Sequence, residues 1–138
     1  MTYDQDDVQN VALCSWKEAR GDGIAACYYV MHVIVNRVGK PGFAHTVHDV
    51  IYGKNQFSSM SIPTDLEYNL QPPATDPVWI ACLADAPNVL GGDDDPTKGA
   101  IWYANPKTAT SGWFATNIAG NPVLHPVLCT IGHHVFYA

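Results

Sequence analysis

Glu18 is the residue best placed for acid–base chemistry in this chain of 138 residues, which contains only one other glutamate, Glu67. Apolar residues precede it at helical spacing and a glycine-rich turn follows at 21–23, so we expect Glu18 in the last turn of a helix. The negative end of the helix dipole and partial burial beside Trp16 both disfavour a charged carboxyl group, which suits a general acid. From the spacing alone, however, a solvated glutamate paired with Arg20 is the favoured interpretation.

A second set of side chains is predicted to bind a substrate near this carboxyl group. The candidates are Gln56, Phe57, Ser58, Tyr103, Asn105 and His134. Gln56 and Ser58 flank Phe57, and Tyr103 and Asn105 flank Ala104, so in a strand the two polar residues of each pair share one face. Each also has a structural interpretation, as a hydrogen-bonded sheet edge, a core aromatic residue with a satisfied hydroxyl group, or a packed histidine.

The elements that must position these residues are mainly helices, and the helix over 24–38 is apolar nearly all round, which is typical of a central core helix. Asp76 and Pro77 are an N-cap and first-turn pair, and Pro87 is expected to break or kink the helix that they begin. The predicted elements are, in chain order, a helix that ends before Gly21, helices over 24–38 and 46–52, a strand over 56–60, a helix from Pro77, and strands over 100–104 and 130–137, with Trp113 and Phe114 in a long loop.

Composition limits the class of protein. Hydrophobic residues make up 47% of the chain and charged residues 14%, which is sufficient for one core, so a single domain over residues 1–138 is expected. The formal net charge is −6 and the basic residues do not cluster, which argues against nucleic-acid binding. The longest apolar stretch, 24–35, is too short for a membrane span. The N-terminus does not resemble a secretory signal, so synthesis in the cytoplasm is expected.

Metal and thiol chemistry are the rival interpretations. The six histidines, which include the pairs His45 with His48 and His133 with His134, allow a zinc amidase or peptidase, but no HExxH motif occurs. No metal and no cofactor are therefore predicted. Cys14 lies four residues before Glu18 and is a conceivable nucleophile, although a buried helix thiol is the favoured interpretation for all four cysteines.

Six segments, in order along the chain, resemble motifs of the SleB-like cell-wall hydrolase family, which includes the spore-cortex-lytic enzymes. They are 16–21 (family motif E-A-R-G), 35–38 (L-N-R-V), 43–52 (F-P-x-T-V-x-D-V-I-Y), 56–58 (Q-F-S), 99–106 (G-A-x-Y-F-Y-N-P) and 130–137 (I-G-N-H-V-F-Y). Trp102 and Ala104 replace aromatic residues of the fifth motif, and His133 replaces the residue before the family histidine, His134.

The resemblance implies an α+β, mainly α, lysozyme-like fold with a central buried helix and a small antiparallel sheet. It implies cleavage of peptidoglycan glycan strands between N-acetylmuramic acid and N-acetylglucosamine, with Glu18 as the catalytic acid. It also implies action on the cell wall, so a protein made in the cytoplasm would need release or delivery, as for a phage lysis enzyme (endolysin) or a secreted effector.

The number of carboxylates separates two mechanisms. Glycoside hydrolysis usually needs two carboxyl groups, whereas a lytic transglycosylase needs one glutamate as acid and then base, because the C6 hydroxyl of the muramic acid is the nucleophile. The second carboxyl groups considered are those of Asp22, Asp49, Asp65 and Glu67, and none has a compelling position in the sequence. Lytic transglycosylation is therefore predicted, with hydrolysis by an Asp-assisted water (a muramidase) as the alternative.

Overall fold

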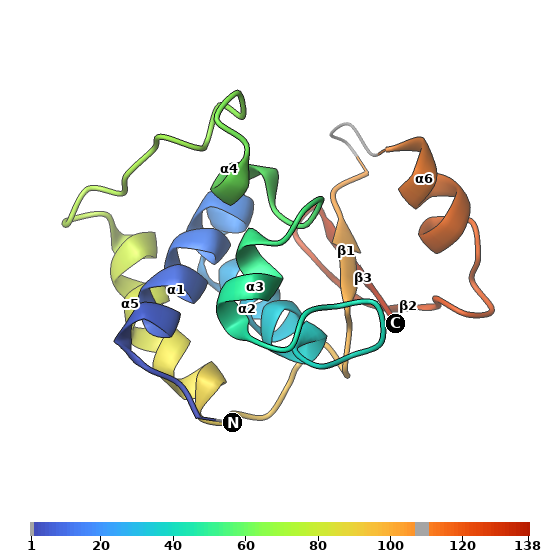
Figure 1. The fold of residues 1–138 in the computed structure, drawn as a ribbon, viewed down its shortest axis with the longest axis horizontal. Coiled ribbons are helices and arrows are strands. Elements are labelled where there is room, and N and C mark those ends of the chain that lie inside the picture. The colour runs from blue at the N-terminus through green and yellow to red at the C-terminus, as the bar shows by residue number, and fades with distance from the viewer. Residues whose placement is uncertain (1, 107–110) are drawn as a thin grey trace.

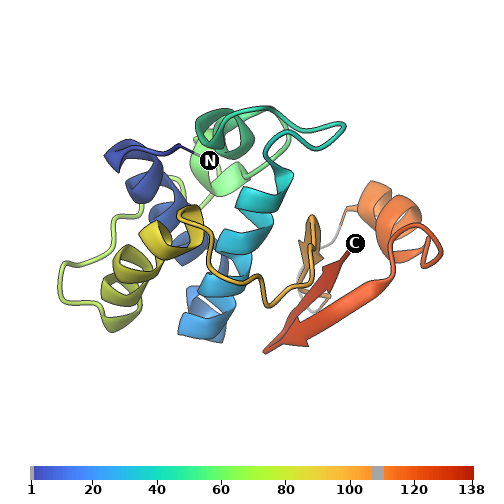
Figure 2. The same ribbon diagram turned by 90° about the horizontal axis from the view of Figure 1, so that it is seen from below.

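The structure is a computed structural model that describes residues 2–106 and 111–138. Its helices and strands are α1 (Gln5–Ala19), η1 (Arg20–Asp22), α2 (Ile24–Arg37), α3 (Val47–Tyr52), α4 (Ser58–Ser61), α5 (Pro77–Leu90), β1 (Trp102–Ala104), α6 (Gly112–Phe114), η2 (Ala115–Ala119), β2 (Val127–Ile131) and β3 (His134–Tyr137). The helices α1 to α5 form one side of the molecule, and the small sheet with α6 and η2 forms the other (Figures 1 and 2).

The first helix ends where the sequence predicts, and this fixes the position of Glu18. Asp4 caps the N-terminus of α1 in a reciprocal capping box with Asp7. At the other end, η1 leads to Gly23, whose φ of +97° is a conformation that favours glycine. The chain therefore turns directly into α2, and Glu18 stays in the last turn of α1 at the edge of the helical part.

The core lies around α2, which is the central buried helix expected from its composition. Met31 and Ile34 of this helix are fully buried, and α2 packs against both α1 and α5. The indole N–H of Trp16 donates to the N-cap carboxylate of α5, Asp76, at 2.6 Å. This bond ties the end of α1 that carries Glu18 to the start of α5.

The sheet has the strand order β1-β3-β2, with both pairings antiparallel. Tyr103 of β1 lies opposite Phe136 of β3, and the ring of Phe136 contacts Tyr29 of α2 with a centroid distance of 5.6 Å. The sheet is thus anchored to the central helix through Phe136, and its first strand presents Tyr103 towards the end of α1.

Two predicted strands differ in the structure. The segment predicted as a strand over 56–60 contains the start of the short helix α4, because the N–H groups of Met60 and Ile62 donate to carbonyl groups within the segment at 3.0 and 2.9 Å. The predicted strand over 130–137 is two strands, β2 and β3, joined by a turn at Gly132. A Cβ atom at residue 132 would lie 2.8 Å from Cγ of Asp22, so the turn requires glycine.

Two further predictions concern helices. Pro87 does not break α5, which continues to Leu90, because the carbonyl group of Pro87 still accepts the N–H of Gly91 at 2.8 Å and Ala86 and Val89 on either side are buried in the core. The Trp113–Phe114 pair lies in the short helix α6 rather than in a loop, and the side chain of Ser111 caps this helix. No helix in the described part of the chain is long and apolar enough to cross a membrane.

Candidate active site

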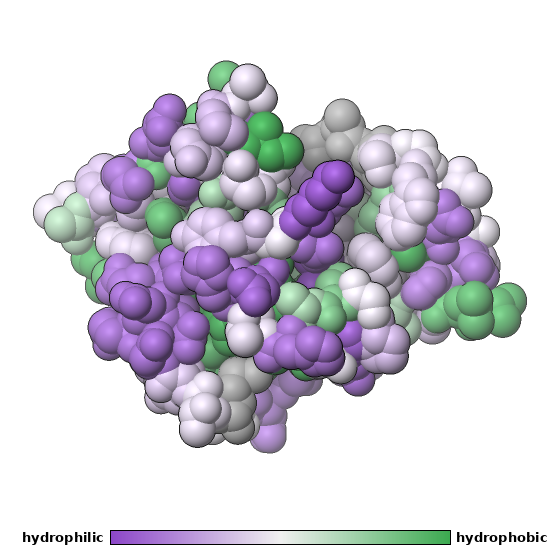
Figure 3. All heavy atoms as spheres, viewed as in Figure 1, coloured by the Kyte–Doolittle hydropathy of each residue, from purple (hydrophilic) through white to green (hydrophobic). Residues whose placement is uncertain are grey.

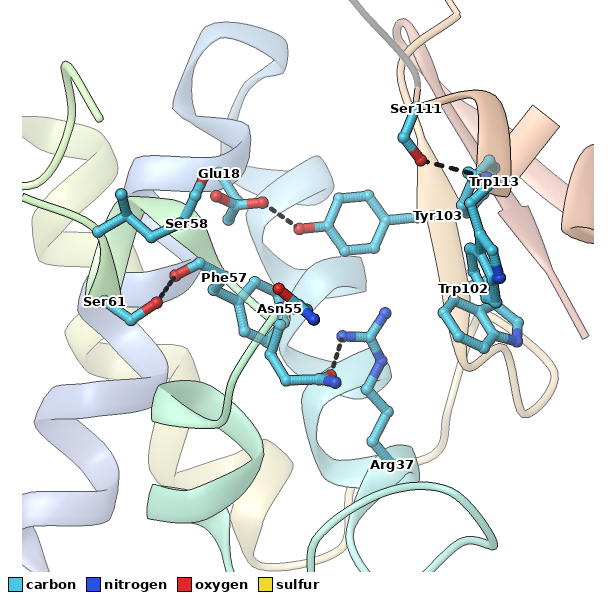
Figure 4. Close-up of a pocket in the computed structure, with 13 residues that line it drawn as sticks. Glu18, Arg37, Asn55, Phe57, Ser58, Ser61, Trp102, Tyr103, Ser111 and Trp113 are labelled. Carbon is cyan, nitrogen blue, oxygen red and sulfur yellow. Dashed lines mark hydrogen bonds between the residues drawn. The ribbon is translucent and has the colours of Figure 1, made fainter. Parts of the chain in front are cut away.

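The carboxyl group of Glu18 receives two hydrogen bonds from opposite sides. The hydroxyl group of Ser59, on α4, donates to Oε2 at 2.8 Å. The hydroxyl group of Tyr103, on β1, donates to Oε1 through a short hydrogen bond. Residues far apart in the sequence therefore hold the carboxyl group at the junction of the helices and the sheet (Figure 4).

Tyr103 is a firm hydrogen-bond donor to this carboxyl group. Burial of its hydroxyl group, and next the negative charge of Glu18, raise the pKa of Tyr103 well above its ordinary value. The phenol therefore keeps its proton over the physiological pH range and fixes the rotamer of Glu18.

The two basic neighbours of Glu18 have other partners. The ammonium group of Lys17 donates to the carbonyl groups of Ser59 and Tyr68 at 3.2 and 2.9 Å. The guanidinium group of Arg20 forms an ion pair with Glu67, and its bond to Glu67 raises the pKa of Arg20. The predicted alternative, in which Glu18 pairs with Arg20, is therefore not the arrangement in the structure.

A cavity of about 790 Å³ opens beside this carboxyl group. Its described lining comprises Glu18, Arg37, Asn55, Gln56, Phe57, Ser58, Ser61, Ile62, Trp102, Tyr103, Ser111, Trp113 and Phe114. The aromatic residues from β1 and α6 face the polar residues around α4 across the cavity (Figure 4), and the molecular surface is hollowed between these two sides (Figure 3). A mixed aromatic and hydrogen-bonding wall suits a carbohydrate ligand.

Four of the six predicted substrate-binding residues lie in this cavity, namely Gln56, Phe57, Ser58 and Tyr103. Because the segment forms α4 rather than a strand, Gln56 and Ser58 reach the cavity from a helix start instead of one strand face. Asn105 and His134 are not among the described lining residues.

His134 lies behind Tyr103. Its ring packs against the Tyr103 ring with a centroid distance of 5.6 Å, and its Nδ1 atom is 2.6 Å from Oδ2 of Asp22. The main-chain N–H of His133 donates to the same carboxylate oxygen at 2.9 Å. His134 therefore contacts both Tyr103 and Asp22 from outside the described cavity lining.

The remaining candidate carboxylates also have partners. The exposed carboxylate of Asp49 lies 3.1 Å from Nδ1 of His48, and the main-chain N–H of Asp49 donates to the hydroxyl group of Thr46, the N-cap residue of α3. Asp65 accepts a hydrogen bond from the hydroxyl group of Ser58 at 2.6 Å, so it is the one that approaches the cavity lining. Glu18 supplies the only carboxyl group among the described lining residues.

Sequence reasoning missed several site residues, among them Ser59, Arg37 and Trp113. Ser59 donates to Glu18, whereas Arg37 and Trp113 line the cavity. Trp102, which replaces an aromatic residue of the fifth motif, lines it as well. Ser59 carries no local signal, because its role depends on a contact 41 residues away. Arg37 did carry one, since an arginine in a helix that is apolar nearly all round must be buried beside a partner.

The described residues support neither the metal chemistry nor the thiol chemistry considered as alternatives. No group of three or more histidine, cysteine, aspartate or glutamate side chains there is arranged to hold a metal ion. Cys14 is fully buried and its burial raises the pKa of the thiol well above its ordinary value, which is typical of a structural cysteine. The four cysteines are free thiols, three of them buried.

Replacing Tyr103 with Phe is expected to lower kcat for the reaction of this site by about tenfold or more, because a charge-assisted hydrogen bond to Glu18 is lost. The matched control is Tyr52→Phe, which removes a hydroxyl group that donates to Asn10. Steady-state kinetics of the two variants measure the effect. Equal kcat values for both would show that the Tyr103 hydroxyl group does not act on Glu18.

Replacing Asp22 with Asn is expected to reduce stability in a pH-dependent way. The hydrogen bond with His134, and then the N–H of His133, lower the pKa of Asp22. A carboxyl group with a lowered pKa stabilises the folded state above its unfolded pKa of about 3.9, and the contribution is lost as the pH falls through the folded value. Urea unfolding at a series of pH values should therefore show a higher free energy of unfolding for the wild type than for Asp22→Asn near neutral pH. This difference should disappear in acid. A gap that does not change with pH, or one equal to that of the exposed control Asp94→Asn, would contradict this.

The fold and the site together define a class of protein. It is a small, mainly helical domain with a sheet at one side, and a glutamate lies between the helices and the sheet in an aromatic-walled cleft. Comparison with known proteins identifies the family. The family model described as "Cell Wall Hydrolase" matches residues 21–137. The chain therefore belongs to the cell wall hydrolase family, which confirms the resemblance seen in the sequence motifs. The matched residues begin just after Glu18, so the position of Glu18 is supported by geometry rather than by this match.

Two relatives and two solved structures show the extent of the similarity. The spore cortex-lytic enzymes of Halalkalibacterium halodurans and Bacillus cereus are 32% and 34% identical to this chain over 134 residues, which are 97% of this chain and 35% and 45% of those proteins. The chain thus spans less than half the length of the curated relatives that it matches.

The structure of the catalytic domain of the Bacillus cereus SleB protein has a TM-score of 0.73 with 31% identity, covering 99% of this chain and 93% of that one. The catalytic domain of the germination-specific lytic transglycosylase SleB from Bacillus anthracis has a TM-score of 0.74 with 31% identity, covering 99% and 97%. The predicted α+β, mainly α, fold is confirmed by these matches.

Proposed function

We propose that this chain cleaves the glycan strands of peptidoglycan between N-acetylmuramic acid and N-acetylglucosamine, and that it does so by lytic transglycosylation. The observation that carries the proposal is that Glu18 supplies the single carboxyl group among the described lining residues, held between Ser59 and Tyr103. Membership of the cell wall hydrolase family and the similarity to a domain described as a lytic transglycosylase support the same substrate and reaction.

In the first step, protonated Glu18 donates its proton to the glycosidic oxygen. The bond between C1 of the muramic acid and that oxygen breaks, N-acetylglucosamine leaves with a new hydroxyl group, and positive charge develops at C1. Tyr103 and Ser59 hydrogen-bond to the carboxylate that forms, so they stabilise the charge created on Glu18 in this step.

In the second step, the C6 hydroxyl group of the same muramic acid attacks C1, and the Glu18 carboxylate takes the hydroxyl proton. A 1,6-anhydro bond forms, Glu18 is again protonated, and no water is consumed. The nucleophile belongs to the substrate, so it acts at a high effective concentration and no second protein carboxylate is needed.

The aromatic wall of the cavity provides the binding surface for the strand. Trp102, Trp113 and Phe114 form this wall, and Trp113 is largely exposed at 58%. Sugar rings stack on such faces, while Gln56 and Asn55, which also line the cavity, offer amide groups to sugar hydroxyl and acetamido groups.

Hydrolysis remains the second candidate function because of Asp65. This carboxylate accepts a hydrogen bond from Ser58, a residue of the cavity lining, so it is the described carboxylate other than Glu18 that approaches the cavity. In that mechanism Asp65 activates the water and Glu18 protonates the leaving group.

Digestion of purified peptidoglycan tests the proposed bond. We expect soluble fragments with uncut stem peptides and newly formed glycan ends. New amino groups or free lactyl carboxyl groups in place of new glycan ends would instead identify an amidase or peptidase and contradict the proposed function.

A further inference from the structure

The ammonium group of Lys17 is a buried positive charge one residue before Glu18. The residue is 8% exposed, and none of the ion pairs formed by the described residues includes it. Burial lowers the pKa of Lys17, because removing this charge from water is costly. Lysine is rarely buried unless it has partners, so its hydrogen bonds show what holds it in this position.

The ammonium group donates to two main-chain carbonyl groups. One belongs to Ser59 of α4, at 3.2 Å, and the other to Tyr68 of the loop that follows, at 2.9 Å. If α4 continued as a helix, the carbonyl group of Ser59 would accept the N–H of residue 63. That residue is Pro63, which has no N–H. Lys17 therefore supplies a donor that the main chain of this segment lacks.

Ser59 is bonded to the end of α1 at two points. Its carbonyl group accepts from Lys17, and its hydroxyl group donates to Oε2 of Glu18 at 2.8 Å. The two α1 residues are adjacent, so the two bonds fix the orientation of Ser59 as well as its position. Figure 4 shows Glu18 beside the start of α4, where Ser58 is labelled.

The helix α4 needs such support because it is very short. It contains four residues, Ser58–Ser61, and no side chain caps its N-terminus. A helical turn of this length is unstable by itself in water. Contacts with α1 must therefore hold α4 in place, and a hydrogen bond from a charged donor such as Lys17 is stronger than one between neutral groups.

We propose that Lys17 is a positioning residue of the active site, which holds Ser59 in the orientation that lets its hydroxyl group donate to Glu18. This inference rests on the proposed function. When Glu18 gives its proton to the glycosidic oxygen, the bond from Ser59 becomes a bond to a carboxylate and strengthens. The placement of Ser59 by Lys17 therefore favours the transition state more than the ground state, so it acts on kcat.

Cleavage kinetics on peptidoglycan strands measure this role. Lys17→Met removes the N–H donors but keeps a side chain of similar length, and we expect kcat to fall by about tenfold with KM nearly unchanged. Lys17→Arg keeps donors at this position and should retain most of kcat. The matched control is Lys40→Met, which removes the same charge at an exposed residue outside the described cavity lining.

A double-mutant cycle shows whether Lys17 acts through Ser59. Ser59→Ala alone should lower kcat at least as much as Lys17→Met, and the double variant should be no slower than Ser59→Ala. Amide hydrogen exchange supplies a readout that needs no substrate. The N–H groups of residues 60–62, which donate within the α4 segment, should exchange about tenfold faster in Lys17→Met than in the wild type or in Lys40→Met.

An unchanged kcat in Ser59→Ala overturns the inference, and this result does not require a Lys17 variant to fold. Losses that multiply in the double variant also overturn it, because Lys17 would then act independently of Ser59. Cleavage with a kcat that Lys17→Met does not change contradicts the role of Lys17 alone. Absence of glycan cleavage by the wild type contradicts the proposed function instead, and the exchange rates then decide whether Lys17 holds Ser59: equal rates in Lys17→Met and the wild type show that it does not.

Discussion

Replacing Glu18 with Gln is expected to lower kcat on peptidoglycan strands by about 1,000-fold or more, because the same carboxyl group serves as acid and then base. The amide has nearly the same shape and can still accept a hydrogen bond from Tyr103. The fold and the binding of glycan strands should therefore persist, so the loss should appear in kcat rather than in KM.

The second glutamate of the chain provides the matched control. Glu67→Gln makes the same chemical change at the ion pair with Arg20, outside the described cavity lining. Release of soluble fragments by the two variants, at equal concentrations of folded protein, measures the difference. If Glu18→Gln keeps activity within a few-fold of Glu67→Gln, Glu18 is not the catalytic acid.

Replacing Phe136 with Ala is expected to destabilise the fold by about 3–5 kcal/mol, the usual cost of deleting a buried aromatic side chain. Phe136 is fully buried in β3 and contacts both Tyr29 of α2 and Tyr103 of β1. Its loss opens a cavity at the joint between the sheet and the central helix. Urea unfolding monitored by circular dichroism measures the change.

Phe136→Leu and Val123→Ala are the comparison variants for this prediction. The first leaves a smaller cavity and should cost less than Phe136→Ala. The second truncates a side chain that is 89% exposed, so we expect a change within about 0.5 kcal/mol. A cost for Phe136→Ala as small as that for Val123→Ala would show that the sheet is not anchored through this residue.

The helical part of the fold could be predicted because its signals are local. The Asp4 cap and the turn that contains Gly23 define the ends of α1, and Asp76 with Pro77 defines the start of α5. These signals placed Glu18 in the last turn of a helix, as the structure has it. The break that Pro87 could have caused does not occur, because tertiary packing retains α5 beyond the proline.

The sheet and the short helices were harder to predict because short segments have ambiguous periodicity. The C-terminal segment suggested one strand, and the turn that divides it lies at Gly132, where a φ of +55° and the close approach of Asp22 both favour glycine. Serine-rich segments such as the one around Ser58 close local hydrogen bonds instead of pairing as strands.

The site residues also divide into those with a local sequence signal and those whose roles depend on distant segments. The carboxyl group, the Gln56–Ser58 segment and Tyr103 followed from the sequence and its motifs, and all lie at one cavity. Ser59 and Arg37 were missed because their roles depend on distant segments that meet only in the fold. A buried charge is the kind of site residue that can be recognised from the sequence, because an arginine such as Arg37 is unusual in an apolar helix.

Mass spectrometry of the glycan products formed in oxygen-labelled water tests the single-carboxylate mechanism of Glu18 most directly. Transglycosylation predicts 1,6-anhydromuramoyl ends that are lighter than reducing ends by one water and contain no labelled oxygen. Reducing muramic acid ends that carry the label would contradict this mechanism and would assign the nucleophile to a water, with Asp65 as the carboxylate to examine next.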